Sequence, residues 1–239
     1  MFKVETHCHI AGLSCCGDGS PNTLLEKYAQ KGYDAIITTT HVSKYCYDYH
    51  YQGETHKEKI DYFYKIHEEF KNLANEYGIR TFMGIEVQSI VDGQEYMLIG
   101  QIEKLMYDNV MYEYSQQDLF EMANKNGLFM YQTHPFREGV MPGDGRFLHG
   151  VEIFNGHYHH ENNNQKAQAF CKQYNLVGVS GTDYHHNTQP ILGGILTAKA
   201  LNDEKELVKC LFENKFKCLI NEEEYIREYI EYIKFKEAK

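Results

Sequence analysis

Histidine and carboxylate residues end several short apolar runs of this sequence. His7 and His9 close the first run, Glu86 closes a later one, and Asp183 and His185 close another. Because successive side chains of a β-strand alternate between its faces, His7 and His9 point to the same side, as do Asp183 and His185. Two further runs end in residues of the same kind, namely His41 and His134.

Side chains of these types have the chemistry of a metal centre. Neutral imidazole together with carboxylate suits Zn²⁺, Mn²⁺ or Fe²⁺, and two carboxylates among several histidines can bridge a pair of ions. A catalytic centre keeps a position open for water, and a paired site can hold a hydroxide that attacks in line at phosphorus. One His-x-His pair is a weak signal, whereas four or more matches at successive strand ends are a strong one.

The elements that position these residues alternate between short β-branched or apolar runs and longer amphipathic stretches. This pattern predicts an α/β fold with a parallel sheet, closed into a barrel or doubly wound, whose strands end at the site. Strands are expected at Phe2–His9, Asp34–His41, Arg80–Gln88, Glu95–Ile102, Gly127–His134, Gly150–Asn155, Leu176–Asp183, Gly193–Thr197 and Lys217–Ile220. Helices are expected at Pro21–Lys31, Glu58–Tyr77, Gln116–Lys125, Gln165–Tyr174, Glu204–Asn214 and Glu222–Phe235.

Composition and charge narrow the class of protein. The 239 residues contain no repeat or linker-like tract, so we expect one domain over residues 1–239, with the apolar stripe of the last helix packed on it. The net charge of −10 argues against extended contact with nucleic acid. No apolar run is long enough for a membrane span and no secretory signal is visible. With seven cysteines in no disulfide pattern, these features predict a cytoplasmic protein with reduced thiols.

A series of short motifs follows in order between residue 5 and about residue 198. They are ThrHisCysHis at 6–9, SerCysCysGly at 14–17, GlyTyrAspAlaIleIleThrThrThrHis at 32–41, GlyIleGluVal at 84–87, GluTyrMetLeuIleGly at 95–100, ThrHisProPheArg at 133–137, GlyValGluIlePheAsn at 150–155 and SerGlyThrAspTyrHis at 180–185. In this order and combination they resemble the PHP (polymerase and histidinol phosphatase) family, and in particular its small stand-alone bacterial members.

The resemblance implies a distorted (β/α)₇ TIM-like barrel with two or three divalent ions, Mn, Zn or Fe, at its mouth. It implies hydrolysis of a phosphate ester by attack of a metal-bound hydroxide, and the acidic charge favours a small phosphomonoester or nucleotide as substrate. Turnover is expected to depend on Arg137, His134 and Asp183, with the guanidinium holding a phosphate oxygen. The metal ligands that the resemblance implies are His7, His9, His41, Glu86, His134, Asp183 and His185.

Three positions depart from the family pattern. Thr40 stands where members usually have an Asp, whose role is more plausibly to orient a ligand than to be one. Tyr96-Met97 stands where many members have a further His, so one ion is expected to bind weakly or to be absent. Asp18 could match an acidic ligand that some members carry after the first motif.

Other residues near the strand ends have less specific roles. Glu152 and Asn155 are expected at the end of one strand, on opposite faces. One of them could orient a metal-bound histidine or contact substrate, while the other packs outside. Glu152 is favoured for the orienting role. The His157–His160 segment is expected to be a solvated or substrate-facing loop rather than a metal site. The alternating tyrosines at 45–51 predict an edge strand or packed loop, with an aromatic lid as the alternative.

Two other classes of function stay open. A metal-dependent amidohydrolase would need the same ligands, and a phosphate-binding Arg137 is what favours the phosphoesterase. The departures at Thr40 and Met97 would also fit a catalytically degenerate barrel kept as a metal-binding module. A substrate screen with phosphate esters and carboxylic esters would separate the phosphoesterase from the amidohydrolase. Full metal occupancy without turnover would support the degenerate metal-binding module.

Overall fold

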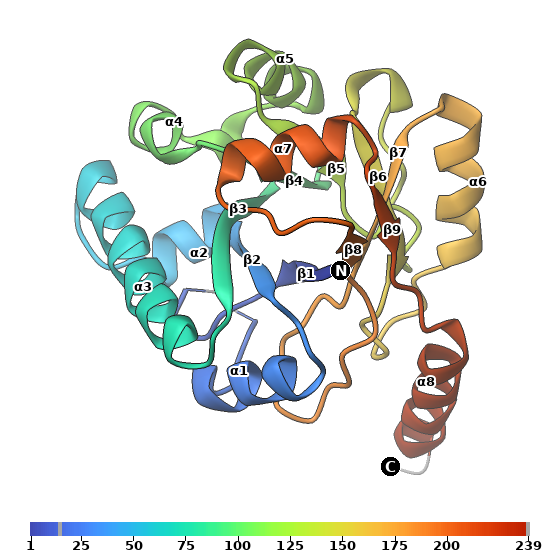
Figure 1. Cartoon of the computed structure of the whole chain (residues 1–239). Coiled ribbons are helices and arrows are strands. Elements are labelled where there is room, and N and C mark those ends of the chain that lie inside the picture. Colours follow the sequence, from blue (N-terminus) through green and yellow to red (C-terminus); the bar gives the residue numbers. More distant parts are fainter. Residues whose placement is uncertain (14–15, 238–239) are drawn as a thin grey trace.

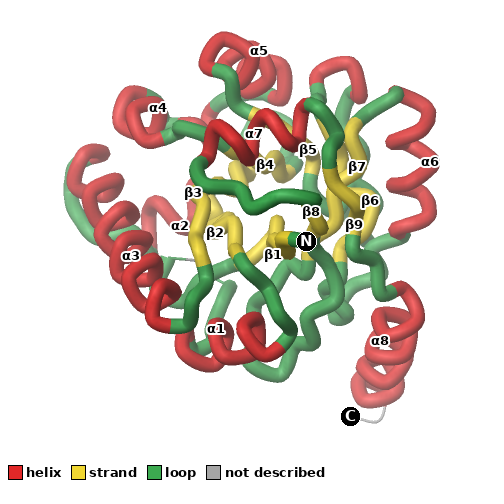
Figure 2. Tube along the Cα trace, in the orientation of Figure 1, coloured by secondary structure: helices red, strands yellow, loops and turns green. Residues whose placement is uncertain are grey.

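The structure is a computed structural model that describes residues 1–13 and 16–237, so Ser14 and Cys15 lie outside the described residues. In this part of the chain nine strands form one sheet, surrounded by helices (Figures 1 and 2). The strands are β1 (Phe2–Cys8), β2 (Ala35–Val42), β3 (Arg80–Gln88), β4 (Glu95–Ile99), β5 (Phe129–Gln132), β6 (Gly150–Asn155), β7 (Val177–Gly181), β8 (Ile195–Thr197) and β9 (Phe216–Cys218). The helices are α1 (Pro21–Gln30), α2 (Lys44–Tyr49), α3 (His56–Glu76), α4 (Glu103–Asp108), α5 (Gln116–Asn126), α6 (Asn164–Tyr174), α7 (Glu204–Phe212) and α8 (Glu222–Glu237).

The strand order is β7-β6-β5-β4-β3-β2-β1-β8-β9, and the sheet curls into a nearly closed barrel. The barrel closes where the Thr6 hydroxyl donates to the Ser180 carbonyl oxygen and Cys8 bridges to Tyr184. The predicted α/β barrel is therefore confirmed. The sheet is not wholly parallel, however, because β4 runs antiparallel to both β3 and β5, and β8 runs antiparallel to β1 and β9.

Two apolar clusters stabilise the barrel. The inner cluster contains Val4, Ile37 and Phe82 from the strands, and Leu207 and Leu211 of α7. In Figures 1 and 2, α7 lies across one end of the barrel, so its buried leucines cover that end. The larger cluster packs the outer faces of the strands against α1, α3 and α5. The open end is left to polar residues.

Side-chain caps fix where α3 and α5 begin. The Thr55 side chain accepts from the backbone N–H of Glu58, whose carboxylate accepts from Thr55 in return, and Ser115 and Asp118 repeat this box at α5. Gly127 then ends α5 in the left-handed region, at φ 65°.

Strand and helix predictions agree with the structure to within a few residues, except for two short helices, α2 and α4. The tyrosine segment forms α2, not an edge strand, because the Ser43 side chain caps it by accepting from the Cys46 N–H. Tyr45 and Tyr49 are exposed, whereas Tyr51 is buried and donates to the His41 carbonyl oxygen. The segment supports the strand end that carries His41.

The C-terminal helix α8 extends from the barrel in Figure 1. Tyr225 is buried against Phe154, and its hydroxyl donates to the His160 carbonyl oxygen. Ile226 and Ile230 are 45% and 46% exposed, so the apolar stripe expected to pack is only partly covered. Among the described helices, none is both long and apolar enough to cross a membrane.

His67 of α3 offers a test of stability that is separate from the site. Its ring lies 3.0 Å from the Thr38 hydroxyl, and burial lowers the pKa of His67 to about 4. Between that value and the unfolded pKa of about 6.5, the unfolded chain binds the extra proton. Stability should therefore fall as the pH is lowered, by about 2 kcal/mol between pH 7.5 and pH 5. Urea unfolding at both pH values should show a smaller loss in His67→Gln, and an equal loss would contradict this reading.

Candidate metal centre

The structure brings all seven residues of the expected ligand set to the open end of the barrel. They line or underlie a cavity of about 410 Å³, whose wall also contains Glu95, Arg137 and His157. His134 and Asp183 lie just beyond β5 and β7 with positive φ of 28° and 54°, a backbone conformation uncommon for these residues. A larger cavity of about 680 Å³ is lined by Tyr64 and His67 and contains none of the predicted site residues.

A register shift in β1 turns His7, and His9 just beyond the strand, toward the site. Val4 faces the inner cluster, so simple alternation would send Glu5, His7 and His9 outward. The pairing with β2 runs Glu5 to Ile36 and then Cys8 to Thr38, so β1 contains one extra residue. Such a bulge reverses the alternation beyond it and re-aims the side chains.

Glu86 is the centre of the cluster. Its Oε1 lies 3.3 Å from Nε2 of both His7 and His134, and its Oε2 lies 3.3 Å from His9 Nε2 and 3.1 Å from His41 Nδ1. Both oxygens are buried and have no hydrogen-bond partner. Ligand atoms that share an ion at about 2.1 Å lie roughly 3.0–3.4 Å from one another. The spacing around Glu86 therefore fits metal coordination.

Asp183 repeats this arrangement on the other side of His7. Its Oδ1 is buried without a hydrogen-bond partner and lies 3.2 Å from Nε2 of both His7 and His9. The donor atoms fall into three overlapping groups that contain carboxylate. These groups are His7, His9 and Asp183; His7, Glu86 and His134; and His41, Glu86 and Glu95.

The charges of the cluster favour the binding of a positive ion. Burial alone would raise the pKa of Glu86 and Asp183, but the neighbouring His7 and, at Asp183, Arg137 hold both well below their usual range. Burial opposes charge on His7 as well, but Asp183, Glu86 and Glu152 raise its pKa well above the usual value. For His9, burial and the neighbouring rings of His185 and His41 lower the pKa. A neutral ring is the form that binds metal.

Glu152 and Asn155 both reach the site, contrary to the expectation that they lie on opposite faces. The pairing of β6 with β7 shifts between Glu152 and Phe154, so a second extra residue restores Asn155 to the inner side. Glu152 Oε1 lies 3.0 Å from His7 Nδ1, and its Oε2 accepts from the His134 backbone N–H and from the Asn155 amide. This arrangement fixes the His7 ring so that its Nε2 faces the cluster.

Arg137 is held inside the site. Its guanidinium donates to Asp183 Oδ2, Asn155 Oδ1 and Asn162 Oδ1, and its side chain is 13% exposed. It also lines the cavity.

Asp18 does not join the cluster. Its side chain is 77% exposed and accepts from His186 Nδ1 at 2.7 Å. His157 and His159 lie in the cavity wall with His186, and the His159 ring stacks on Tyr232 of α8. The 157–160 loop therefore faces the cavity. The sequence predicts no metal site here, but the donor atoms of His157, His159 and His186 form a group that could hold a metal ion.

Sequence reasoning missed Glu95. Because β4 is antiparallel to its neighbours, its first residue, not its last, lies at the open end of the barrel. Glu95 Oε1 is 3.8 Å from His41 Nδ1 and Oε2 is 3.4 Å from His134 Nε2. An acidic side chain thus lies close to the position where the sequence departs from the family pattern at Tyr96-Met97.

Glu5 is a second residue that sequence reasoning missed. It is fully buried beneath the cluster, and its Oε1 accepts from the backbone N–H groups of Thr6, His7 and Thr182. Its Oε2 accepts from the Tyr28 hydroxyl. The carboxylate thereby ties the strand end that carries His7 to the loop that leads to Asp183.

Gly181 permits the close approach of β7 to His7. A Cβ at this position would lie 2.5 Å from His7 Cβ and 2.9 Å from Glu152 Oε1. We expect Gly181→Ala to lower the free energy of unfolding by about 1–3 kcal/mol and to weaken metal binding, because the His7 ring must move. Urea unfolding and metal titration would measure both. Gly78→Ala is the control, because a Cβ at Gly78, where φ is 71°, meets open space, and this variant should leave metal binding unchanged. Equal metal affinity in Gly181→Ala and the wild type would show that the close approach of β7 does not position the His7 ring.

No family model and no curated protein matches this chain. Solved structures do match it. A two-domain protein from Bacteroides vulgatus that contains a predicted PHP-like metal-dependent phosphoesterase superposes with a TM-score of 0.65 and 18% identity, over 96% of this chain and 69% of that one. The chain has a PHP-type fold.

Two further solved structures superpose on this chain. PsfC from Pseudomonas syringae superposes with a TM-score of 0.69 and 14% identity, over 100% of this chain and 99% of that one. An amidohydrolase from Chromobacterium violaceum superposes with a TM-score of 0.53 and 12% identity, over 92% of this chain and 99% of that one. At such identities the similarity shows a shared fold and no more.

Proposed function

We propose that this protein is a metal-dependent phosphoesterase that hydrolyses a small phosphomonoester or nucleotide. The observation that carries the proposal is the pair of buried carboxylates, Glu86 and Asp183, whose unpartnered oxygens face histidine nitrogens at 3.1–3.3 Å. The described residues offer three such carboxylate-containing groups, which suits two or three divalent ions. When bound, the ions would polarise a phosphate ester and lower the pKa of the attacking water.

The chain's own residues hold and orient the reactants. His7, His9 and Asp183 would hold one ion, while Glu86 with His134, His41 and Glu95 would hold its neighbour. Glu152 keeps the His7 ring in place through Nδ1.

Arg137 would bind a phosphate oxygen and stabilise the charge that develops on it. It lines the same cavity as the ligand cluster, and Asp183, Asn155 and Asn162 fix its position. This cationic group is the feature that favours the phosphoesterase over the amidohydrolase. The cavity of about 410 Å³ has room for a small ester but not for an extended polymer.

The test is elemental analysis of protein purified without chelator, combined with hydrolysis of an aryl phosphate and of an aryl carboxylic ester. We expect two or more ions per chain and metal-dependent release of phosphate, which His134→Ala should abolish. Preferential cleavage of the carboxylic ester would support the amidohydrolase. Full metal occupancy with turnover of neither would support the metal-binding module.

A further inference from the structure

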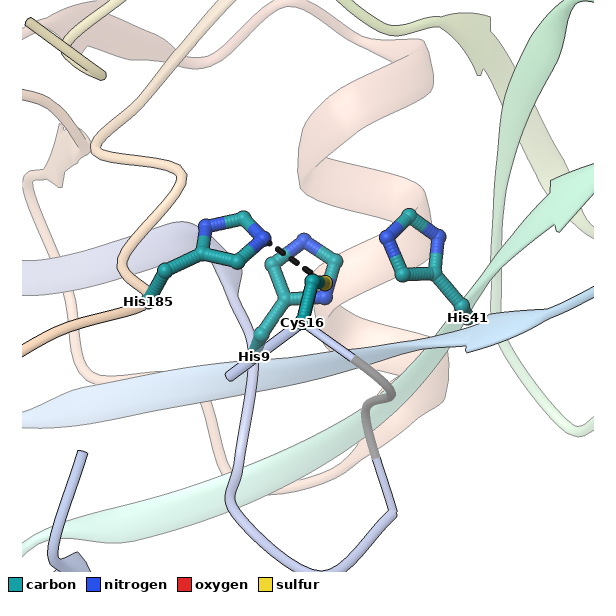
Figure 3. Close-up of side chains that lie close together, drawn as sticks. All are labelled: His9, Cys16, His41 and His185. Carbon is teal, nitrogen blue, oxygen red and sulfur yellow. Dashed lines mark hydrogen bonds between the residues drawn. The ribbon is translucent and has the colours of Figure 1, made fainter. Parts of the chain in front are cut away.

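Cys16 belongs to a further group of donor atoms, one without a carboxylate, at the mouth of the barrel. In Figure 3 its side chain lies among those of His9, His41 and His185. His185 Nε2 is 3.0 Å from the Cys16 sulfur, and the donor atoms of all four residues lie within 4.8 Å of one another. His9 and Cys16 come from the segment after β1, His41 comes from β2, and His185 comes from the loop after β7.

The loop that carries Cys16 is anchored against His185. The backbone N–H groups of Asp18 and Gly19 both donate to the His185 carbonyl oxygen at 3.1 Å. His185 is fixed in turn, because its backbone N–H donates to the Gln189 side chain and its ring Nδ1 lies 2.9 Å from the Asp183 carbonyl oxygen. Since a ring nitrogen next to a carbonyl oxygen carries the proton, Nε2 is left with its lone pair toward the sulfur.

This group differs in chemistry from the three groups that contain a carboxylate. The carboxylate-containing groups suit Mn²⁺, Fe²⁺ and Zn²⁺ alike, whereas three imidazoles with one thiolate form a soft donor set. Sulfur and imidazole together are typical ligands of Zn²⁺ and disfavour Mn²⁺. The sequence pointed to Asp18 as the acidic ligand from this loop, but the structure turns Asp18 outward to His186 and brings Cys16 inward.

We propose that Cys16 is a thiolate ligand of a third ion, which it shares with His41 and His185 beside His9, and that it makes this position selective for Zn²⁺ over Mn²⁺. The inference rests on the metal centre of the proposed function but not on the reaction. Binding at this position replaces the thiol proton by the ion, so one proton is released to solvent for each ion bound.

Cobalt substitution tests the ligand directly. Full-length protein stripped of metal and loaded with Co²⁺ should show the near-ultraviolet charge-transfer band of a thiolate–cobalt bond. Cys16→Ser should lose this band and should bind its last equivalent of Zn²⁺ more weakly, by at least the roughly 10–100-fold that the loss of an outer-sphere partner costs. Cys171→Ser is the matched control, because it makes the same change at a thiol of α6 that donates to the Leu176 carbonyl oxygen, and it should keep the band.

Two further measurements keep the test decisive. Cys16→Asp should restore binding of the third ion relative to Cys16→Ser, but without the charge-transfer band. The metal preference of this position should shift from Zn²⁺ toward Mn²⁺. In the wild type, Zn²⁺ should protect Cys16 from alkylation, read by mass spectrometry, which requires no variant to fold. A band that survives in Cys16→Ser, or alkylation of Cys16 at the same rate with and without Zn²⁺, would overturn the proposal. Absence of phosphoesterase activity alone would overturn the proposed function and leave this inference standing.

Discussion

Replacing Glu86 by glutamine is expected to lower turnover of a phosphate ester by about 10³-fold or more and to remove at least one ion per chain. Glutamine has nearly the same shape as glutamate, but its amide group carries no charge. The amide also places an N–H donor where a carboxylate oxygen would bind the ion together with the neighbouring histidine rings. Both oxygens of Glu86 face histidine nitrogens, and two of the carboxylate-containing groups depend on this side chain. Metal ions supply several kcal/mol of transition-state stabilisation, and each 1.36 kcal/mol is tenfold in rate.

Elemental analysis and kcat would be measured together in Glu86→Gln and in Glu121→Gln. The second variant makes the same chemical change on the exposed face of α5 and should behave as the wild type. Unchanged metal content in Glu86→Gln would show that the carboxylate is not a ligand. Unchanged turnover despite metal loss would show that the ions are not catalytic.

Removing the metal is expected to destabilise the fold as well as to stop turnover. An ion that binds the folded chain but not the unfolded chain stabilises it by about 3–4 kcal/mol when its free concentration is 100–1,000 times its dissociation constant. Without the ion, both oxygens of Glu86 and Oδ1 of Asp183 stay buried without a hydrogen-bond partner, and burying unsatisfied polar atoms is costly. Urea unfolding of chelator-treated and Zn²⁺-reloaded protein would measure the difference.

Glu86→Gln again provides the comparison for this second prediction. Because the variant binds fewer ions, chelation should lower its stability by less than it lowers that of the wild type. If chelation left the unfolding midpoint of the wild type unchanged, the cluster would not hold a metal that binds the folded state specifically.

Strand ends were predictable because hydrophobic patterning and chain order are local properties. The apolar runs before Glu86 and His134 are visible in the sequence, and the structure has strands there. Alternating tyrosines at 45–51 misled the prediction because periodicity of two ignores the Ser43 cap that starts α2. Local capping outweighed the pattern over so short a segment.

The sequence by itself determined which donor types lie at the strand ends and in what order, and hence that they suit a metal. Only the tertiary structure decided which of them face one another. One extra residue in β1 turns His7 and His9 inward, another in β6 returns Asn155 to the same side as Glu152, and the reversed direction of β4 brings Glu95 to the mouth. Register and strand direction are set by backbone hydrogen bonds between segments far apart in the chain, and side-chain patterning along a single strand does not encode them.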